Sequence, residues 1–208
     1  MQREVDVPTC KDVLGWKIMQ YIKGIENYKN DNETAITLGK FDGLHQGHEL
    51  LISRVIEHQK HDRVDGVVFV FDMNPLYQKT GMVYERLLSN EEKVARLDER
   101  VDYFVECPFV DDIAKIEPEV FIEDILVKVF NAKYVVVGTD FRFGYNRRGD
   151  VKMLKEYSSK YGFTVEAIEK KQYHGREISS TYIKEELKKG NISKAEELLG
   201  YSYTQRKK

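Results

Sequence analysis

The fold of this chain is decided at a glycine-punctuated turn, Gly39-Lys40-Phe41-Asp42-Gly43-Leu44-His45-Gln46-Gly47-His48. An apolar run at residues 35–38 precedes it and another at residues 50–52 follows, which predicts a strand, a turn and the start of a helix. Glycines let the backbone approach a ligand closely, and a helix start carries unpaired N–H groups and the positive end of the helix dipole. A phosphate is the expected ligand at such a turn.

Two histidines, His45 and His48, lie three residues apart at this helix start, so their ring N–H groups can reach the same phosphate. The alternative is a turn between a strand and a helix with two solvated histidines, but His-x-Gly-His at this point is more specific than a glycine-rich turn alone. The chain contains no Gly-x-x-x-x-Gly-Lys-Ser/Thr, and the turn does not match Gly-x-Gly-x-x-Gly. The sequence therefore excludes a P-loop and a dinucleotide fingerprint.

Composition narrows the class of protein. With 208 residues, of which 41% are hydrophobic, the chain can bury one sizeable core. Charged residues make up 33% but nearly cancel to a net charge of −2, which gives no support to a nucleic-acid or membrane-surface partner. Cys10 and Cys107 are far apart and are expected to be free thiols. No apolar run resembles a signal peptide or a transmembrane segment, so we expect a cytoplasmic protein.

Strand-like and helix-like patterns alternate along the chain, which predicts an α/β fold with a doubly wound, mostly parallel sheet. The expected strands are residues 35–38, 66–71, 103–106, 134–138 and 163–168. The expected helices are residues 47–59, 90–100, 118–130, 150–161, 180–189 and 193–199. We expect one domain from residue 21 to 208, preceded by an arm of unknown role, residues 1–20, that contains Trp16.

Three further segments follow strands or begin a helix, where ligands of such sheets bind. In the first, Asp72, Asn74 and Pro75 end a buried strand, and Asp72 could bind a metal or a ribose hydroxyl or could cap the turn. The second displays aromatic rings, an acid and an arginine that suit a heteroaromatic ring and its phosphates, or rings that cover the core. Its residues are Gly138, Asp140, Phe141, Arg142, Phe143 and Gly144.

The third of these segments, Ser179-Ser180-Thr181, places hydroxyls ahead of a predicted helix, with Lys184 one turn later. Helix N-capping explains one hydroxyl. Three in succession also suit a second phosphate cradle.

Together these segments resemble the FMN adenylyltransferase (FAD synthetase) module of the bacterial bifunctional riboflavin kinase/FAD synthetase family, over residues 21–203. Residues 39–48 are similar to the family's nucleotidyltransferase signature, residues 138–144 to its second hallmark and residues 178–181 to its third. The resemblance implies a Rossmann-like fold of the HxGH nucleotidyltransferase superfamily. It also implies transfer of AMP from ATP to FMN, giving FAD and pyrophosphate, with Mg²⁺ as the usual metal.

The resemblance assigns roles to residues of this chain. His45, His48 and Ser180 are expected to be catalytic, through positioning and charge neutralisation without a covalent intermediate. Asp72, Asn74 and Pro75 are expected near the flavin. The nucleotide is expected to contact Gly39, Phe41, Asp42, Gly43, Gly47, Gly138, Asp140, Phe141, Arg142, Phe143, Gly144, Ser179, Thr181 and Lys184.

The chain departs from the family at three points. Asn74 stands where the family commonly has histidine, and Lys184 where it often has arginine, which removes a bidentate fork. The family's riboflavin kinase domain would begin after Tyr203, so no riboflavin phosphorylation is expected.

Two alternatives therefore stay open. One is another HxGH nucleotidyltransferase, of the cytidylyltransferase or pantetheine-phosphate adenylyltransferase type. The other is a non-catalytic protein that binds flavin or adenine nucleotides. A metal site at His58, His61 and Asp62 is not expected, because these residues are interpreted as a solvated helix end.

Overall fold

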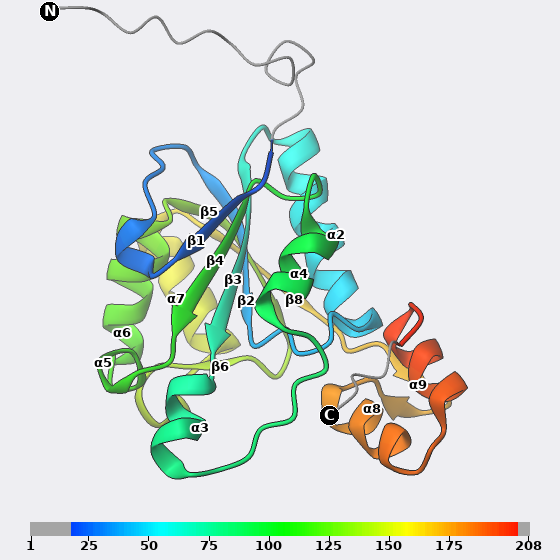
Figure 1. The fold of residues 1–208 in the computed structure, drawn as a ribbon. Coiled ribbons are helices and arrows are strands. Elements are labelled where there is room, and N and C mark those ends of the chain that lie inside the picture. Colours follow the sequence, from blue (N-terminus) through cyan, green and yellow to red (C-terminus); the bar gives the residue numbers. More distant parts are fainter. Residues whose placement is uncertain (1–17, 204–208) are drawn as a thin grey trace, which may run out of the picture.

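A six-stranded, fully parallel sheet forms the centre of the computed structural model, which describes residues 18–203 (Figure 1). The strand order is β1-β4-β3-β2-β5-β8. From β2 the chain builds toward β3 and β4 on one side, and toward β5 and β8 on the other. The strands are β1 (Gln20–Lys23), β2 (Thr34–Gly39), β3 (Asp65–Asp72), β4 (Tyr103–Pro108), β5 (Ala132–Gly138) and β8 (Thr164–Ile168).

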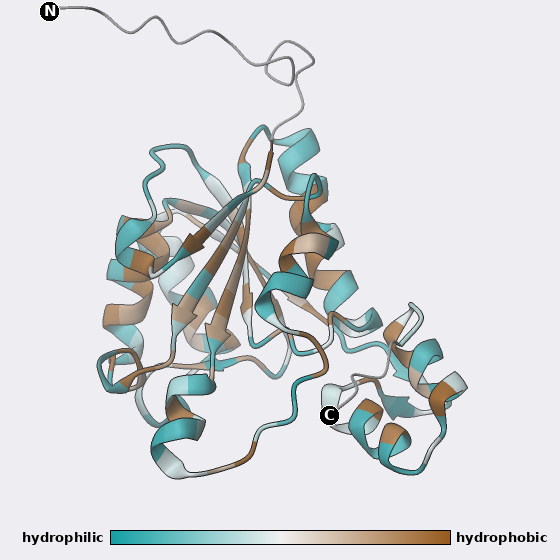
Figure 2. Cartoon of the chain, in the orientation of Figure 1, coloured by the Kyte–Doolittle hydropathy of each residue, from teal (hydrophilic) through white to brown (hydrophobic). Residues whose placement is uncertain are grey.

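Both faces of the sheet are covered, which explains why its central strands read as nearly continuous apolar runs. In β3, Val67 and Phe69 belong to one core cluster, and Val68 and Val70 to another, because successive side chains point to opposite faces. Figure 2 shows the hydrophobic strands at the centre and hydrophilic residues on the outward surfaces of the helices.

Helices α2 and α4 cover one face of the sheet, and the segment from Pro118 to Val129 with α7 covers the other (Figure 1). A capping box fixes the start of α4, where Ser89 Oγ accepts from the Glu92 N–H and the Glu92 carboxylate accepts from the Ser89 N–H. The helices are α2 (Gln46–His61), α3 (Asn74–Thr80), α4 (Asn90–Leu97), α5 (Asp111–Ala114), α6 (Pro118–Val120), a π-helical segment (Phe121–Val129), α7 (Val151–Tyr161), α8 (Ser180–Lys188) and α9 (Ile192–Leu199).

Helices α8 and α9 pack on each other at the carboxyl end of the sheet and form a small core of their own with Leu87 (Figure 1). Two short hairpins complete the fold. They pair β6 (Arg142–Phe143) with β7 (Gly149–Asp150), and β9 (Gln172–Tyr173) with β10 (Arg176–Glu177).

The predicted fold class is confirmed, and each predicted strand is present within two residues of its expected bounds. The predicted helix 90–100 ends at Leu97, because Glu99 adopts a left-handed backbone with φ of 62°. The expected helix 118–130 divides into α6 and the π-helical segment. Strand β1 was not predicted: it has four residues, and its pattern of exposed and half-buried side chains gives a weak signal. Trp16, Cys10 and most of the expected N-terminal arm lie outside the described residues.

Among the described residues, no helix is long and apolar enough to cross a membrane.

Candidate active site

A pocket of about 470 Å³, here called the central pocket, lies beyond the carboxyl ends of β2, β5 and β8. This is where the sheet changes its direction of growth, and ligands of open α/β sheets bind at that point. The residues expected at the site that line it are Gly39, Phe41, Asp42, His45, Gly47, His48, Gly138, Asp140, Phe141, Ser179, Ser180, Thr181 and Lys184. The motif segments around residues 39–48, 138–141 and 179–184 therefore meet at one cavity.

The turn between β2 and α2 holds three residues in the left-handed region. Phe41 has φ of 47°, Gly43 of 91° and Leu44 of 40°. The φ of residue 43 favours glycine, and a side chain there would also meet the Leu87 side chain at 2.7 Å. Gly43 does not line the central pocket, and its expected contact with a nucleotide is not supported by the geometry.

Side chains from three distant segments hold the carbonyl groups of this turn. Lys93 Nζ on α4 donates to the carbonyl of residue 40 at 3.2 Å. Ser180 Oγ at the start of α8 donates to that of residue 42 at 2.7 Å, and the Tyr201 hydroxyl donates to that of residue 43 at 2.6 Å. These bonds stabilise a turn whose positive φ angles are unfavourable for Phe41 and Leu44.

Asp42 is a buried hub rather than a free ligand. Its carboxylate accepts from the Tyr84 hydroxyl and from the Leu87 N–H, each at 2.8 Å, and pairs with Lys184 Nζ at 2.5 Å. Lys184 Nζ also lies 4.5 Å from the centre of the Tyr84 ring. Asp42 therefore ties the turn to the segment before α4 and to α8.

The two motif histidines stack on each other, with ring centroids 3.7 Å apart. His45 caps α2: its Nδ1 accepts from the N–H of Gly47 at 3.2 Å and of His48 at 3.4 Å. The expectation that these N–H groups are unpaired was therefore wrong in this structure, because the imidazole itself satisfies them.

Both imidazoles are neutral near pH 7. Burial lowers the pKa of His45 to about 4 and lowers the pKa of His48 well below its usual value, with smaller contributions to His48 from His45 and Lys93. His48 Nδ1 is buried and has no hydrogen-bond partner among the described residues. An unsatisfied buried polar atom beside a pocket is what a bound ligand would complete.

The hydroxyl segment Ser179-Ser180-Thr181 is only partly free to contact a ligand. Ser179 Oγ caps α8 by accepting from the Tyr182 N–H at 3.2 Å, and Ser180 holds the turn as described above. The exposed Thr181 lines the central pocket without such a capping role. Capping, the simpler explanation, thus applies to Ser179.

A second cavity of about 850 Å³, the aromatic pocket, adjoins the central pocket. Arg142, Phe143 and Gly144 of the second hallmark line this cavity and not the central one, and Arg142 pairs with Asp150 at 2.6 Å. Sequence reasoning missed most of its aromatic wall, because its phenylalanines read as ordinary core residues. The missed aromatic residues are Phe71, Phe109, Phe121 and Tyr145. Gly39, Lys40, Asp140 and Phe141 line both cavities and form the ridge between them.

The residues expected near the flavin do not gather in the aromatic pocket. Asp72 Oδ1 accepts from the Asn74 N–H at 3.2 Å at the start of α3, which is the turn-capping alternative. Asn74 and Pro75 line neither cavity, whereas their neighbour Met73 lines the aromatic one.

A resident metal has no ready-made site, because the described residues contain no cluster of three or more His, Cys, Asp or Glu side chains placed to bind one. Mg²⁺ commonly binds through substrate phosphates with few protein ligands, and the central pocket offers side-chain oxygens on Asp140 and Thr181. The donor set fits Mg²⁺ that arrives with a nucleotide.

His58 is not a solvated residue as interpreted from the sequence. Its ring is buried, stacks on Tyr134 at 3.7 Å, and contacts Asp62 Oδ2 at 2.7 Å and Glu166 Oε1 at 2.8 Å. It joins the end of α2 to β8 and acts in packing.

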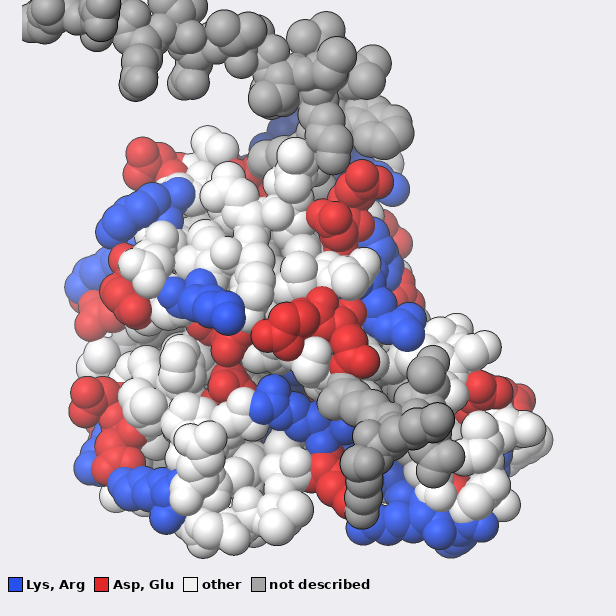
Figure 3. Space-filling model, viewed as in Figure 1, with Lys and Arg blue, Asp and Glu red and all other residues white. Residues whose placement is uncertain are grey.

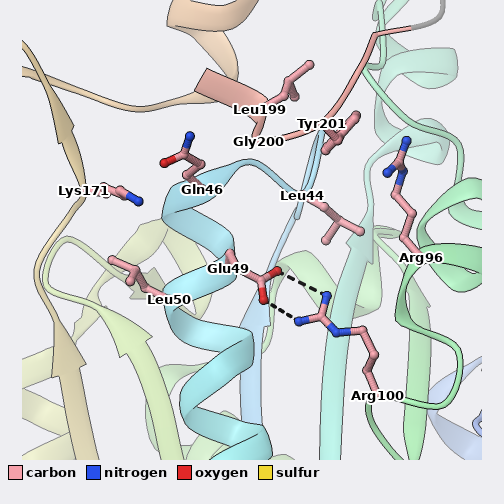
Figure 4. Close-up of a pocket in the computed structure, with 10 residues that line it drawn as sticks. All are labelled: Leu44, Gln46, Glu49, Leu50, Arg96, Arg100, Lys171, Leu199, Gly200 and Tyr201. Atoms are coloured by element: carbon pink, nitrogen blue, oxygen red, sulfur yellow. Dashed lines mark hydrogen bonds and ion pairs between the residues drawn. The ribbon is translucent and has the colours of Figure 1, made fainter. Parts of the chain in front are cut away.

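A third hollow lies on the other side of the first turn of α2 (Figure 4). There Arg100 donates to both carboxylate oxygens of Glu49, and the Arg96 guanidinium lies 3.7 Å from the centre of the Tyr201 ring. None of the site residues expected from the sequence lines it. On the face drawn in Figure 3, acidic and basic side chains alternate without a large field of one sign.

Known proteins similar to this chain carry names that agree with the motifs. A model of the FAD synthetase family matches residues 27–182. A bifunctional riboflavin kinase/FMN adenylyltransferase of Buchnera aphidicola (from Schizaphis graminum) is 32% identical over 190 residues, 89% of this chain and 61% of the relative. The Escherichia coli K12 protein of the same name is 34% identical over 89% of this chain and 60% of the relative. An FAD synthetase of Listeria monocytogenes is 29% identical over 84% of this chain and 72% of the relative.

The fold is also found among solved structures. The crystal structure of a macrolide-efflux protein from Streptococcus pneumoniae matches with a TM-score of 0.75 and 26% identity, over 89% of this chain and 63% of that chain. The chain spans about three fifths of the length of the bifunctional relatives. The family match covers most of the chain and contains the turn, most of the central pocket and both later hallmarks, and the chain belongs to the FAD synthetase family.

Proposed function

We propose that this protein is an FMN adenylyltransferase, which transfers AMP from ATP to FMN and releases pyrophosphate. The observation that carries the proposal is the pair of adjoining cavities, one lined by the motif residues and one by aromatic rings, with four residues lining both. A reaction that joins two nucleotides through their phosphates needs two binding sites that meet at the phosphates.

ATP would occupy the central pocket and FMN the aromatic pocket. The aromatic pocket suits an isoalloxazine ring, because flat rings bind between aromatic side chains and its wall contains Phe71, Phe109 and Phe141. The ridge would then bring the FMN phosphate close to the α-phosphate of ATP. Other HxGH nucleotidyltransferases need no such aromatic cavity for a small acceptor, which favours FMN over the alternative acceptors.

The transfer is a direct in-line displacement. An oxygen of the FMN phosphate forms a bond to the α-phosphorus of ATP while the bond from that phosphorus to the bridging oxygen breaks. Pyrophosphate leaves with the electron pair of the broken bond, and nothing is oxidised or reduced. Since a phosphate monoester is largely a dianion at pH 7, the nucleophile needs no general base, and catalysis consists of positioning and charge stabilisation.

The histidines would act as neutral hydrogen-bond donors. In the His45 ring Nδ1 is the acceptor that caps α2, so Nε2 carries the proton and can donate to a phosphate oxygen. His48 has an unpartnered Nδ1 for the same purpose. Mg²⁺ would supply further charge neutralisation, with the triphosphate as its main ligand and the oxygens of Asp140 and Thr181 available.

The test is to incubate the chain with ATP, Mg²⁺ and FMN and to separate FAD and pyrophosphate by chromatography. Appearance of both from FMN, and a loss on the order of 10²-fold in kcat for H48A, are expected. H61A is the matched control, because His61 lies at the far end of the same helix. If FMN and ATP bind but no FAD forms, the non-catalytic alternative is correct.

A further inference from the structure

Among residues 18–203, Lys40 is the only cationic residue that lines both cavities. Two other lysines line the central pocket, and both are already neutralised: Lys184 pairs with Asp42 at 2.5 Å, and Lys170 pairs with Asp140 at 2.7 Å. Lys40 has no carboxylate oxygen within ion-pair distance among the described residues, although its residue is exposed. Lys40 therefore differs from these two lysines. Within the part of the chain that the structure describes it is a cation without a counter-ion, and it lies on the ridge between two proposed anion sites.

The backbone carbonyl of Lys40 accepts a hydrogen bond from a second lysine, Lys93. Lys93 is 4% exposed, and its Nζ donates to the Lys40 carbonyl at 3.2 Å and to Asn90 Oδ1 at 2.9 Å. Within residues 18–203, no carboxylate lies within ion-pair distance of this buried ammonium. Burying a charge against neutral acceptors costs free energy of folding. We therefore expect the Lys93 ammonium to have a role at the site.

Lys93 keeps its proton under ordinary conditions. Burial lowers its pKa to about 8, and Arg86 acts in the same direction, whereas the charges of Asp42, Asp72 and Glu106 oppose the shift. The group is therefore largely an ammonium at pH 7, and a strong donor to the Lys40 carbonyl.

The backbone conformation of Phe41, the residue after Lys40, explains why the Lys40 carbonyl needs this hydrogen bond. Phe41 has φ of 47° and is buried, so the peptide between Lys40 and Phe41 must keep an orientation that the unfolded chain rarely adopts. A donor fixed on α4 removes the freedom of that peptide to rotate. The Lys40 side chain then leaves the backbone in a fixed direction, on the ridge.

Resting on the proposed function, we propose that the Lys40 ammonium contacts the FMN phosphate and the α-phosphate of ATP together, and that Lys93 is the positioning residue that holds Lys40 in place. The reaction brings two anions to one phosphorus atom, and a cation shared by both lowers their repulsion most when charge develops between them. Lys93 itself is too buried to contact either substrate. Its effect on the reaction passes through Lys40.

A double-mutant cycle on the full chain tests both parts. K40M is expected to lower kcat for FAD formation on the order of 10²-fold, and K40R to recover most of it. K93M is expected to lower kcat about 10-fold in a chain that has Lys40 and to have no further effect in K40M, because two residues that act as one unit are not additive. K152M is the control, since the Lys152 side chain on α7 is 85% exposed.

Each outcome decides one part. Wild-type kcat in K40M overturns the contact, and losses that multiply in the double mutant overturn the positioning role. Circular dichroism and thermal melting check folding, and N90A, which keeps the ammonium and removes its side-chain acceptor, enters the same cycle if K93M does not fold. Should the wild-type chain itself make no FAD, the proposed function fails and the role of Lys40 fails with it.

Discussion

Replacing Asp42 with alanine is expected to destabilise the fold before it affects any ligand. The carboxylate is buried and accepts from Tyr84, Leu87 and Lys184. The Leu87 N–H is left buried and unpaired in D42A, which costs about 1–3 kcal/mol. The Tyr84 hydroxyl and the partly exposed Lys184 ammonium can turn to water, so each adds only about 0.5–1 kcal/mol. The expected loss is about 2–5 kcal/mol.

Two further variants make the origin of this loss measurable. In D42N the amide oxygen still accepts from the Leu87 N–H, so a loss of only about 1–2 kcal/mol is expected. D140A is the matched control: Asp140 also lines the central pocket, but its side chain is 65% exposed and its ion pair with Lys170 lies at the surface. Its effect should stay within about 0.5 kcal/mol.

Urea unfolding followed by circular dichroism measures the three variants. With a slope of about 2 kcal/mol per molar urea, D42A should lower the midpoint by about 1–2.5 M at an unchanged slope. Equal midpoints for D42A and D140A would refute the reasoning, because Asp42 would then be a ligand of the pocket and not a structural hub.

Three more predictions concern other parts of the molecule. The free energy of unfolding should fall by about 3 kcal/mol as the pH is lowered from about 6.5 to about 4. The reason is that His45 takes up a proton near its usual pKa in the unfolded chain and only near 4 in the folded chain. Urea titrations of H45Q should show a smaller loss of stability over the same pH range. H58A should cost about 2–4 kcal/mol, because it removes a buried ring that stacks on Tyr134 and bonds Glu166, and a midpoint that responds to added zinc would contradict a purely structural role. F109A should raise the KM for FMN about 10-fold and leave that for ATP unchanged, with equal changes in both arguing against the aromatic pocket as the flavin site.

The sequence was sufficient to predict where the site lies, because the carboxyl ends of parallel strands share one edge of a sheet. Once Gly39 and Gly138 are placed at the ends of two such strands, their loops must be close. The hydroxyl segment Ser179-Ser180-Thr181 was harder to place, since it follows no strand of the main sheet. Its position near the turn depends on α8, which packs through its own small core.

The aromatic pocket could not be predicted in the same way. Phe71 ends a buried strand and Phe121 lies on a helical stripe, and an apolar pattern does not distinguish a ring that faces the core from one that faces a cavity. The interpretation of His58 as a solvated residue was wrong for a related reason. Its polar neighbours in the sequence indicated a solvated helix end, whereas its partner Glu166 lies 108 residues later. Both errors come from contacts between residues that are distant in sequence.

The three donors to the carbonyls of residues 40, 42 and 43 connect the fold to the chemistry of the turn. A carbonyl oxygen carries partial negative charge and repels a phosphate, so a turn at an anion site must direct its carbonyl groups to other partners. Lys93, Ser180 and Tyr201 provide those partners from three separate segments. Of the three, only Lys93 is charged and buried, which makes its removal the change expected to disturb the turn most. If Y201F, which removes the donor to residue 43, lowers kcat as much as K93M, the turn works by geometry alone and the buried charge has no separate role.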